Sequence, residues 1–234
     1  MCRKCTAIHT LHNHDRDLGI YMDSYVSMRS HVIKTVSACF AVLRQLRSIR
    51  RSVPRSVFQS LVTSLVLSRL DHGNATLAGI PLYQLKRLQL VMNPAARLVC
   101  TSWRYDPITP LLHKLHWLKS AERIDYKLAV LVYKCRQGAA PSCLADELRE
   151  SVDFEARCRL HSTSSSSLVI RRTRLSTVGD RAFPVAVARV WNSLPQHVTS
   201  AQSLPVFHSR LHISIIKISV TLPYSDTLNI LLTC

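Results

Sequence analysis

The fold is indicated most clearly by a stretch near the N-terminus, SMRSHVIKTVSACFAVLRQLRSIRR (residues 27–51). Apolar side chains recur in it every three or four residues, which is the spacing of one face of an α-helix. The apolar face would comprise Val32, Val36, Cys39, Phe40, Leu43, Leu46 and Ile49. Four arginines, at positions 44, 47, 50 and 51, lie largely off this face. We therefore expect a long helix with one buried side and one basic, solvent-facing side.

The same helical spacing recurs along most of the chain, so the sequence predicts a mainly α protein built as a helical bundle. The expected further helices cover residues 54–70, 82–100, 121–136, 141–150 and 180–194, with a last helix from 203 that turns Leu204, Phe207 and Leu211 inward. Pro94 falls in the middle of one of them, where proline kinks or splits a helix at a cost of about 3 kcal/mol. Residues 168–175 favour a short strand, so a small α+β segment would follow the bundle.

We expect the chain to comprise five parts. They are an unstructured N-terminus (1–16), a basic helical region (17–150), a Ser-rich linker (151–167), a C-terminal strand and helix module (168–212) and a tail (213–234). The module contains GDRAFPVAVARVWNSLP (residues 179–195). In this segment we expect Asp180 to cap a helix, Trp191 to anchor it in a core and Pro195 to end it.

Positive charge is the strongest global property of the chain. Its 234 residues include 31 Lys and Arg against 14 Asp and Glu, which gives a formal net charge of +17 at pH 7. Between residues 24 and 121 the only acidic residues are Asp71 and Asp106. Such an excess attracts polyanions, with nucleic acid first and anionic membranes second, although a single cation taken alone is more often a solvated surface charge than a phosphate contact. The residues expected to contact nucleic acid are Arg44, Arg47, Arg50, Arg51, Arg55, Lys86 and Arg87.

The sequence displays no recognisable catalytic site. Its five glycines are isolated, so neither a phosphate-binding loop nor a dinucleotide-binding fingerprint can form. It lacks a Gly-x-Ser-x-Gly motif, and no two aspartates are adjacent, which disfavours serine hydrolase and two-metal phosphoryl-transfer chemistry. We expect neither catalytic activity nor a bound cofactor.

The eight cysteines form no recognisable disulfide framework, which indicates reduced thiols in a nuclear or cytoplasmic protein. Cys2 and Cys5, followed by His9, His12 and His14, have the ligand types that bind Zn²⁺. Only three residues separate Cys5 from His9, too few for the hairpin between the ligand pairs of a zinc finger, so no metal site is expected. The N-terminus lacks the apolar segment of a signal peptide, and charges and a proline interrupt the apolar tail, so we expect no membrane association.

Six segments resemble, in order, the C-terminal region of non-LTR retrotransposon reverse transcriptases of the LINE-2/CR1/jockey-like type. They are LGIYMDSYVSMRSHV (18–32), LVLSRLDHGNATLAGIP (65–81), LKRLQLVMNPAARLV (85–99), ITPLLHKLHWLKSAERIDYKLAVLVYK (108–134), GAAPSCLADEL (138–148) and RTRLSTVGDRAFPVAVARVWNSLP (172–195). The resemblance covers about Asp17 to Leu211. Pro94 departs from the usual alanine of this family, and His72 and Gly73 stand where an aromatic residue and a cysteine are commoner.

The resemblance implies that the chain starts where the catalytic palm of such a polymerase ends, because Leu18-Gly19 resembles the end of the palm. Residues 17–150 would then be the helical thumb, which grips the template–primer duplex, and 168–212 the segment after it. Residues 213–234 resemble nothing in the family. The catalytic aspartates of the palm and the endonuclease would be missing, so no catalytic residue can be carried over to this chain.

We therefore expect a truncated, non-catalytic fragment of an RNA-directed DNA polymerase that binds RNA and DNA backbones with low specificity. Its expected protein partner is the rest of a retroelement polymerase, supplied in trans. Two alternatives remain open at this point, a fragment without selected function and a recruited protein-interaction module.

Overall fold

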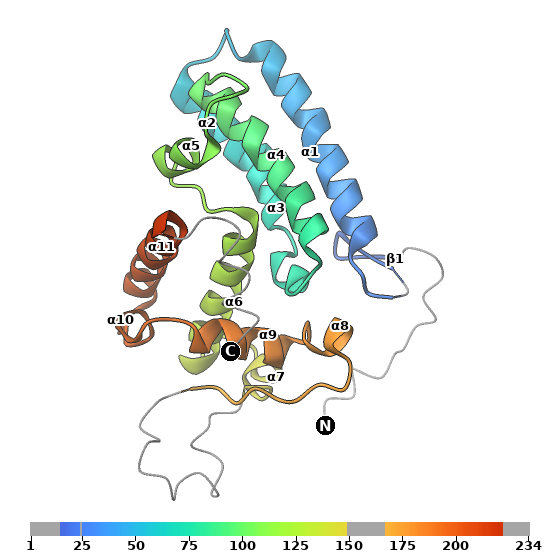
Figure 1. Cartoon of the computed structure of the whole chain (residues 1–234), viewed down its shortest axis with the longest axis vertical. Helices are drawn as coiled ribbons and strands as arrows, with labels where there is room; N and C mark the ends of the chain where they lie inside the picture. Colours follow the sequence, from blue (N-terminus) through green and yellow to red (C-terminus); the bar gives the residue numbers. More distant parts are fainter. Residues whose placement is uncertain (1–14, 24, 149–166, 222–234) are drawn as a thin grey trace, which may run out of the picture. The chain divides into compact units, whose positions relative to one another are not determined.

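The computed structural model describes residues 15–23, 25–148 and 167–221, which are mainly helical (Figure 1). The expected mainly α class is confirmed. The described residues form two compact units. Unit 1 contains the described residues up to Gly73 together with Ile80–Ile108, and unit 2 contains Asn74–Gly79 together with the described residues from Thr109 onward.

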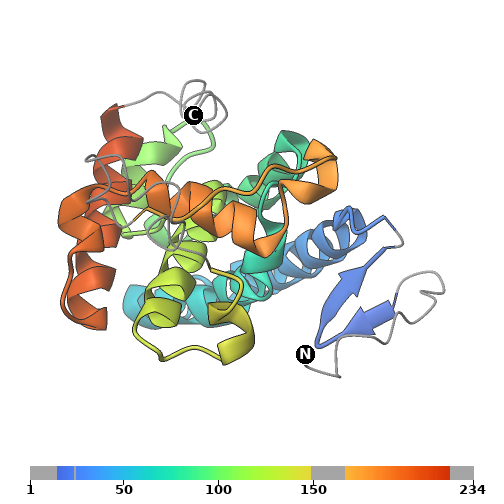
Figure 2. The ribbon, with the colours of Figure 1, turned by 90° about the horizontal axis from the view of Figure 1, so that it is seen from below.

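Unit 1 combines a small β-hairpin with long helices. The strands β1 (Asp15–Asp17) and β2 (Ile20–Met22) pair antiparallel, and the hairpin lies beside the start of helix α1 (Arg29–Ile49) (Figure 2). The other helices of unit 1 are α2 (Arg55–Val62), the π-helical turn η1 (Thr63–Leu67), α3 (Ser68–Asp71) and α4 (Leu82–Cys100). The run from α2 to α3 is continuously helical, and α4 continues across Pro94 as one helix.

The helices α1 and α4 pack against each other and run in the same direction. Near their N-terminal ends the Gln84 side-chain amide donates to the Ser27 carbonyl oxygen (3.2 Å), and at their C-terminal ends Arg50 Nε donates to the Leu98 carbonyl oxygen (2.9 Å). The core of unit 1 is apolar and includes Val32, Cys39, Leu43, Leu46, Phe58, Val62, Val66, Leu88, Val91, Met92, Ala95, Ala96 and Val99.

The buried face of α1 is narrower than the sequence predicts. Phe40 and Ile49 were both expected on it, yet they are 37% and 40% exposed. Successive helix positions are about 100° apart, so Phe40 is turned away from the side on which Cys39 and Leu43 are buried. Helix periodicity identifies a face that can be buried, whereas the packing partner decides how much of it is covered.

Unit 2 is built around α6 (Ser120–Arg136), which contacts η2, α9 and α11. The other elements are the 3₁₀ turn η2 (Asn74–Leu77), α7 (Ser142–Ala145), α8 (Ser176–Gly179), α9 (Phe183–Asn192), α10 (Gln196–Thr199) and α11 (Leu204–Thr221). Helix α5 (Ile108–Lys114) begins at the last residue of unit 1, and its remaining residues belong to unit 2. Tyr133 and Trp191 both stack on the Phe207 ring, with centroid separations of 4.3 and 6.0 Å. Phe207, Leu211 and Trp191 are buried, which confirms their predicted inward positions.

The strand expected over residues 168–175 does not form. The Leu168 N–H donates to Asn192 Oδ1, and Asn192 Nδ2 donates to the Leu168 carbonyl oxygen, both at 2.9 Å. Leu168 also forms a single β-bridge, and residues 169–175 contain no strand. Within the described ranges the only strands are β1 and β2, so the expected α+β character of the C-terminal segment is not seen there.

The boundary between the units also differs from the expected division near residue 150. Helix α6 was expected in the same region as α1 and α4, but its packing partners α9 and α11 place it in unit 2. Helix α11 continues to Thr221, beyond the expected boundary at 212. The expected unstructured N-terminus, the Ser-rich linker and the tail lie mostly outside the described residues, except that positions 15 and 16 form part of β1.

Candidate nucleic-acid interface

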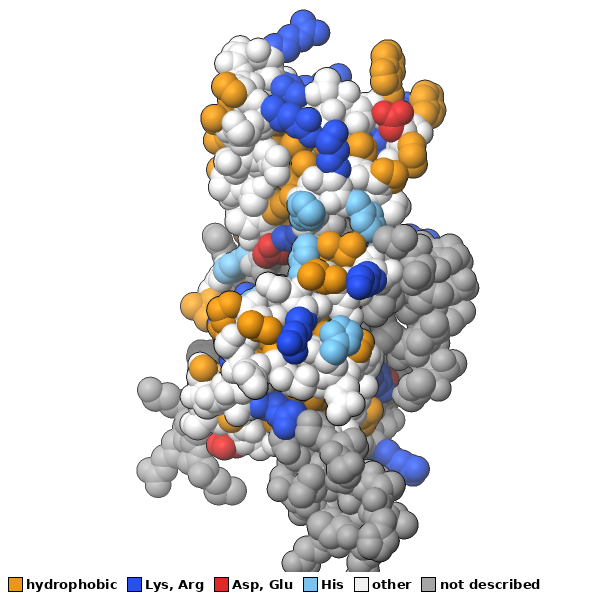
Figure 3. All heavy atoms as spheres, turned by 90° about the vertical axis from the view of Figure 1, so that its left-hand side faces the viewer, with side chains coloured by type: hydrophobic (Ala, Val, Ile, Leu, Met, Phe, Trp, Pro, Cys, Tyr) orange, Lys and Arg blue, Asp and Glu red, His pale blue; other side chains and the backbone are white. Residues whose placement is uncertain are grey.

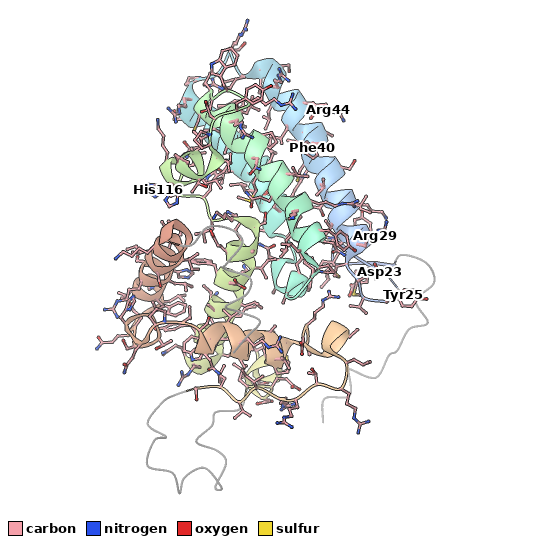
Figure 4. All side chains as sticks on the ribbon, viewed as in Figure 1. Asp23, Tyr25, Arg29, Phe40, Arg44 and His116 are labelled. Carbon is pink, nitrogen blue, oxygen red and sulfur yellow. The ribbon has the colours of Figure 1, made fainter. Side chains whose placement is uncertain are left out.

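Six of the seven basic residues predicted to contact nucleic acid are exposed, namely Arg44, Arg47, Arg51, Arg55, Lys86 and Arg87. All of them belong to unit 1. Figure 3 shows Lys and Arg side chains gathered near the top of one face, close to protruding hydrophobic side chains. Figure 4 labels Arg44 on α1, together with Phe40 and Arg29 of the same helix. The six side chains are exposed to solvent, and one of them, Arg55, also donates through Nη2 to Cys100 Sγ at 3.7 Å.

The seven residues do not form a single cluster. The first group lies on the last two turns of α1 or just beyond them, where α1 contacts the C-terminal end of α4, and it comprises Arg44, Arg47, Arg50, Arg51 and Arg55. Lys86 and Arg87 lie near the N-terminal end of α4. At 1.5 Å per residue, the length of α4 between Lys86 and Cys100 is about 21 Å. The candidate residues therefore occupy two groups at opposite ends of the helix pair.

Arg50 differs from its neighbours because its guanidinium is used inside unit 1. Besides the bond to the Leu98 carbonyl, its Nη2 donates to Thr101 Oγ1 at 2.5 Å, and its Cζ lies 5.0 Å from the centroid of the Phe58 ring. The Leu98 carbonyl is among the last four of α4, which lack intrahelical partners. Arg50 thus joins the ends of three helices, which gives it a stabilising role, while its contact with nucleic acid stays a prediction.

Sequence reasoning missed an exposed turn next to this arginine group, Trp103–Asp106. Trp103 and Tyr105 are 81% and 89% exposed, and the exposed Arg104 stands between them. The signal that could have found the turn is the alternation of aromatic and basic residues in a short segment that follows a helix. This pattern is typical of surfaces that stack on nucleic-acid bases.

The described residues also hold a small pocket and a buried thiol. Residues 15–23, 25–148 and 167–221 contain no group of three or more His, Cys, Asp or Glu side chains that could hold a metal ion, and the candidate zinc ligands Cys2, Cys5, His9, His12 and His14 lie outside these ranges. A pocket beside Trp117 has about 10 Å³ of free space, enough for about one water molecule. Burial raises the pKa of the Cys39 thiol to about 11, which keeps it protonated and unreactive.

The segment 179–195 serves packing within unit 2. Asp180 does not cap α9, whose first flanking residue is Ala182; instead its carboxylate accepts a hydrogen bond from Thr173 Oγ1 (2.7 Å) and pairs with Arg189 Nη2 (3.1 Å). The bond from Thr173 lowers the pKa of Asp180, and Arg189 adds to this effect. The predicted cap is therefore wrong, because Asp180 is the residue after α8 and lies two residues before Ala182, and its carboxylate is engaged by Thr173 and Arg189.

Neighbouring residues of this segment are also occupied by structural contacts. A Cβ at Gly179 would lie 2.5 Å from the Thr173 Cβ, so only glycine fits there without a shift. Arg181 Nε donates to the Ala78 carbonyl oxygen (3.2 Å), and the Arg136 guanidinium lies 5.2 Å from the Trp191 ring centroid. These contacts hold the segment in place within unit 2.

None of the described helices is both long and apolar enough to cross a membrane. No protein-family model matches the chain, and comparisons with curated proteins and with solved structures gave no match either.

Proposed function

We propose that the chain is a thumb-like, non-catalytic part of a non-LTR retrotransposon reverse transcriptase that binds RNA and DNA through their phosphate backbones. The observation that carries this proposal is the set of six exposed Lys and Arg side chains on unit 1. They belong to a region with few acidic residues. Few negatively charged side chains are therefore present to repel a polyanion from this unit. The ordered segments that resemble this family support the same assignment.

The proposed binding is of low specificity and without catalysis. Lys and Arg side chains that reach phosphates fix a protein on nucleic acid but carry no direct sequence information. The two groups of cations at opposite ends of α4 suit contacts to separate stretches of backbone. The catalytic aspartates of the family have no counterpart in the matched segments, so in our proposal the reaction depends on the rest of a polymerase, supplied in trans.

The test measures the affinity of the full chain for a fluorescent RNA–DNA hybrid of about 20 base pairs at several salt concentrations. If six cations contact phosphates, the slope of log K against log salt is about −5, and affinity falls about 10³-fold between about 50 and 200 mM salt. The double variant Arg51→Ala/Arg55→Ala is expected to reduce this slope by about 2.

A matched control removes two cations from unit 2. Arg172 and Arg174 are both exposed, so Arg172→Ala/Arg174→Ala lowers the net charge by the same amount as the unit 1 variant. We expect its slope to stay close to that of the unaltered chain. An affinity that does not depend on salt, or equal losses in the two double variants, contradicts the proposed binding by unit 1.

A further inference from the structure

The turn Trp103–Asp106 presents two aromatic rings on a fixed backbone. The Asp106 N–H donates to the Trp103 carbonyl oxygen (3.2 Å), and the Trp103 N–H donates to Asp106 Oδ2 (2.7 Å). Arg97 Nη2 donates to the Asp106 carbonyl oxygen (3.1 Å), which ties the turn to α4. Both rings are more than four-fifths exposed although the backbone that carries them is held by three hydrogen bonds.

The turn is joined to the arginine group at the end of α1. Arg50 donates to Thr101 Oγ1 at 2.5 Å, and Arg55 Nη2 lies 3.7 Å from Cys100 Sγ, so the residues just before the turn contact the segment between α1 and α2. Arg51 directly follows Arg50 in the chain, Arg104 directly follows Trp103, and both side chains are exposed. We call the exposed residues Arg51, Arg55, Trp103, Arg104 and Tyr105 the aromatic–arginine patch.

The charge of the patch favours an anionic ligand. It holds three arginines, and the acidic residue beside it, Asp106, already has one carboxylate oxygen engaged by the Trp103 N–H. The Arg104 guanidinium lies 6.0 Å from the Tyr105 ring centroid, so charge and ring surface adjoin. Bases stack on exposed aromatic rings while their phosphates meet neighbouring cations, a combination that single strands satisfy because their bases are unpaired.

We infer that the aromatic–arginine patch binds single-stranded nucleic acid, with unpaired bases stacked on Trp103 and Tyr105 and phosphates against Arg51, Arg55 and Arg104. This inference rests on the proposed function, since it assigns a strand preference to the same basic unit. It adds a contact to the bases, which backbone binding alone does not include. A fully paired, blunt duplex offers such stacking only at its ends.

The test compares the full chain with Trp103→Ala and Tyr105→Ala variants on two kinds of probe. The probes are fluorescent (dT)15 and (rU)15 single strands and a blunt 15-base-pair duplex. Each substitution is expected to weaken single-strand binding about tenfold and duplex binding less than twofold. The salt slope should stay unchanged, because no cation is removed. Both side chains are exposed, so the far-ultraviolet circular dichroism of the variants should match that of the unaltered chain.

The matched control is Tyr25→Ala, which removes a tyrosine of similar exposure (84%) next to the N-terminal hairpin. It should leave single-strand affinity unchanged. Tryptophan emission gives a second readout, because Trp117 and Trp191 are buried (8% and 3% exposed) and only Trp103 of the three tryptophans is open to solvent. Addition of (dT)15 should quench the Trp103 emission, and the quenching should be lost in Trp103→Ala.

The outcomes separate the two proposals. Salt-dependent binding that is equal for single strand and duplex, and that neither aromatic substitution weakens, overturns the stacking inference while leaving backbone binding in place. An equal loss in Tyr25→Ala overturns it as well, because the effect would then not belong to the patch. Failure of every probe to bind at about 50 mM salt overturns the proposed function itself.

Discussion

Replacing Arg50 by lysine separates a structural role from a binding role within one group of arginines. Lysine keeps the positive charge but has a single ammonium group in place of the planar guanidinium fork. It cannot reproduce the two hydrogen bonds to Leu98 and Thr101 together with the position over Phe58. We expect Arg50→Lys to destabilise unit 1 and to leave the salt dependence of binding nearly unchanged.

The size of the effect follows from the contacts that are lost. A hydrogen bond from a charged group contributes about 1.5–3 kcal/mol, and a surface cation–π contact adds about 0.5–1 kcal/mol. The bond to Thr101 is exposed and competes with water, so the loss of one partly buried bond and the ring contact gives about 2 kcal/mol. Arg51→Ala removes an exposed side chain, and its effect on stability should stay within about 0.5 kcal/mol.

Urea unfolding followed by circular dichroism measures the stability, and hydrogen exchange of peptides that cover residues 92–101 localises the change to the end of α4. We expect faster exchange there in Arg50→Lys and no change in Arg51→Ala. The salt slope should show the opposite pattern, with a decrease of about 0.9 on a duplex for Arg51→Ala alone. If Arg50→Lys unfolds at the same urea concentration as the unaltered chain, the structural role assigned to Arg50 is refuted.

Three further predictions concern packing and pH. Asn192→Asp keeps the acceptor for the Leu168 N–H but sets a carboxylate oxygen against the Leu168 carbonyl oxygen. We expect the free energy of unfolding of unit 2, measured with urea, to fall by about 1–2 kcal/mol. An equal loss in Gln196→Ala, an exposed control in the same unit, would contradict this reason. Gly179→Ala pushes the Thr173 side chain away from Asp180 and should lower the free energy of unfolding by about 1–3 kcal/mol, which a lower thermal midpoint would show. An unchanged midpoint would mean that the contact between Gly179 and Thr173 is less tight than described. Burial lowers the pKa of His31 below its ordinary 6.5, so the unfolded chain takes up this proton first and unit 1 loses stability as the pH falls below about 6.5. His31→Gln should shrink the difference in urea midpoint between about pH 7.5 and 5.5, and an identical difference would argue against a buried neutral imidazole.

Several features of the fold could be predicted because they depend on near neighbours in the chain. The helical class follows from apolar residues spaced three or four apart, and the inward positions of Trp191, Phe207 and Leu211 follow from the same spacing. The exposure of Arg51 and Arg55 to solvent could also be predicted, since charged side chains are rarely buried without a partner. The hairpin at residues 15–22 was missed because two three-residue strands are too short to show an alternating pattern.

The candidate interface could be predicted only in part. Charge and helix phase identified basic side chains, but they could not assign Arg50 to the end of α4, because Leu98 lies 48 residues further along the chain. Nor could they bring the Trp103 turn beside Arg55, since this proximity depends on α1 and α4 running in the same direction. The sequence itself determined helix positions and net charge, which arise from local spacing and composition. The tertiary structure alone decided which of those charges contact other parts of the fold and which stay exposed, because a side chain's partners depend on packing between distant segments.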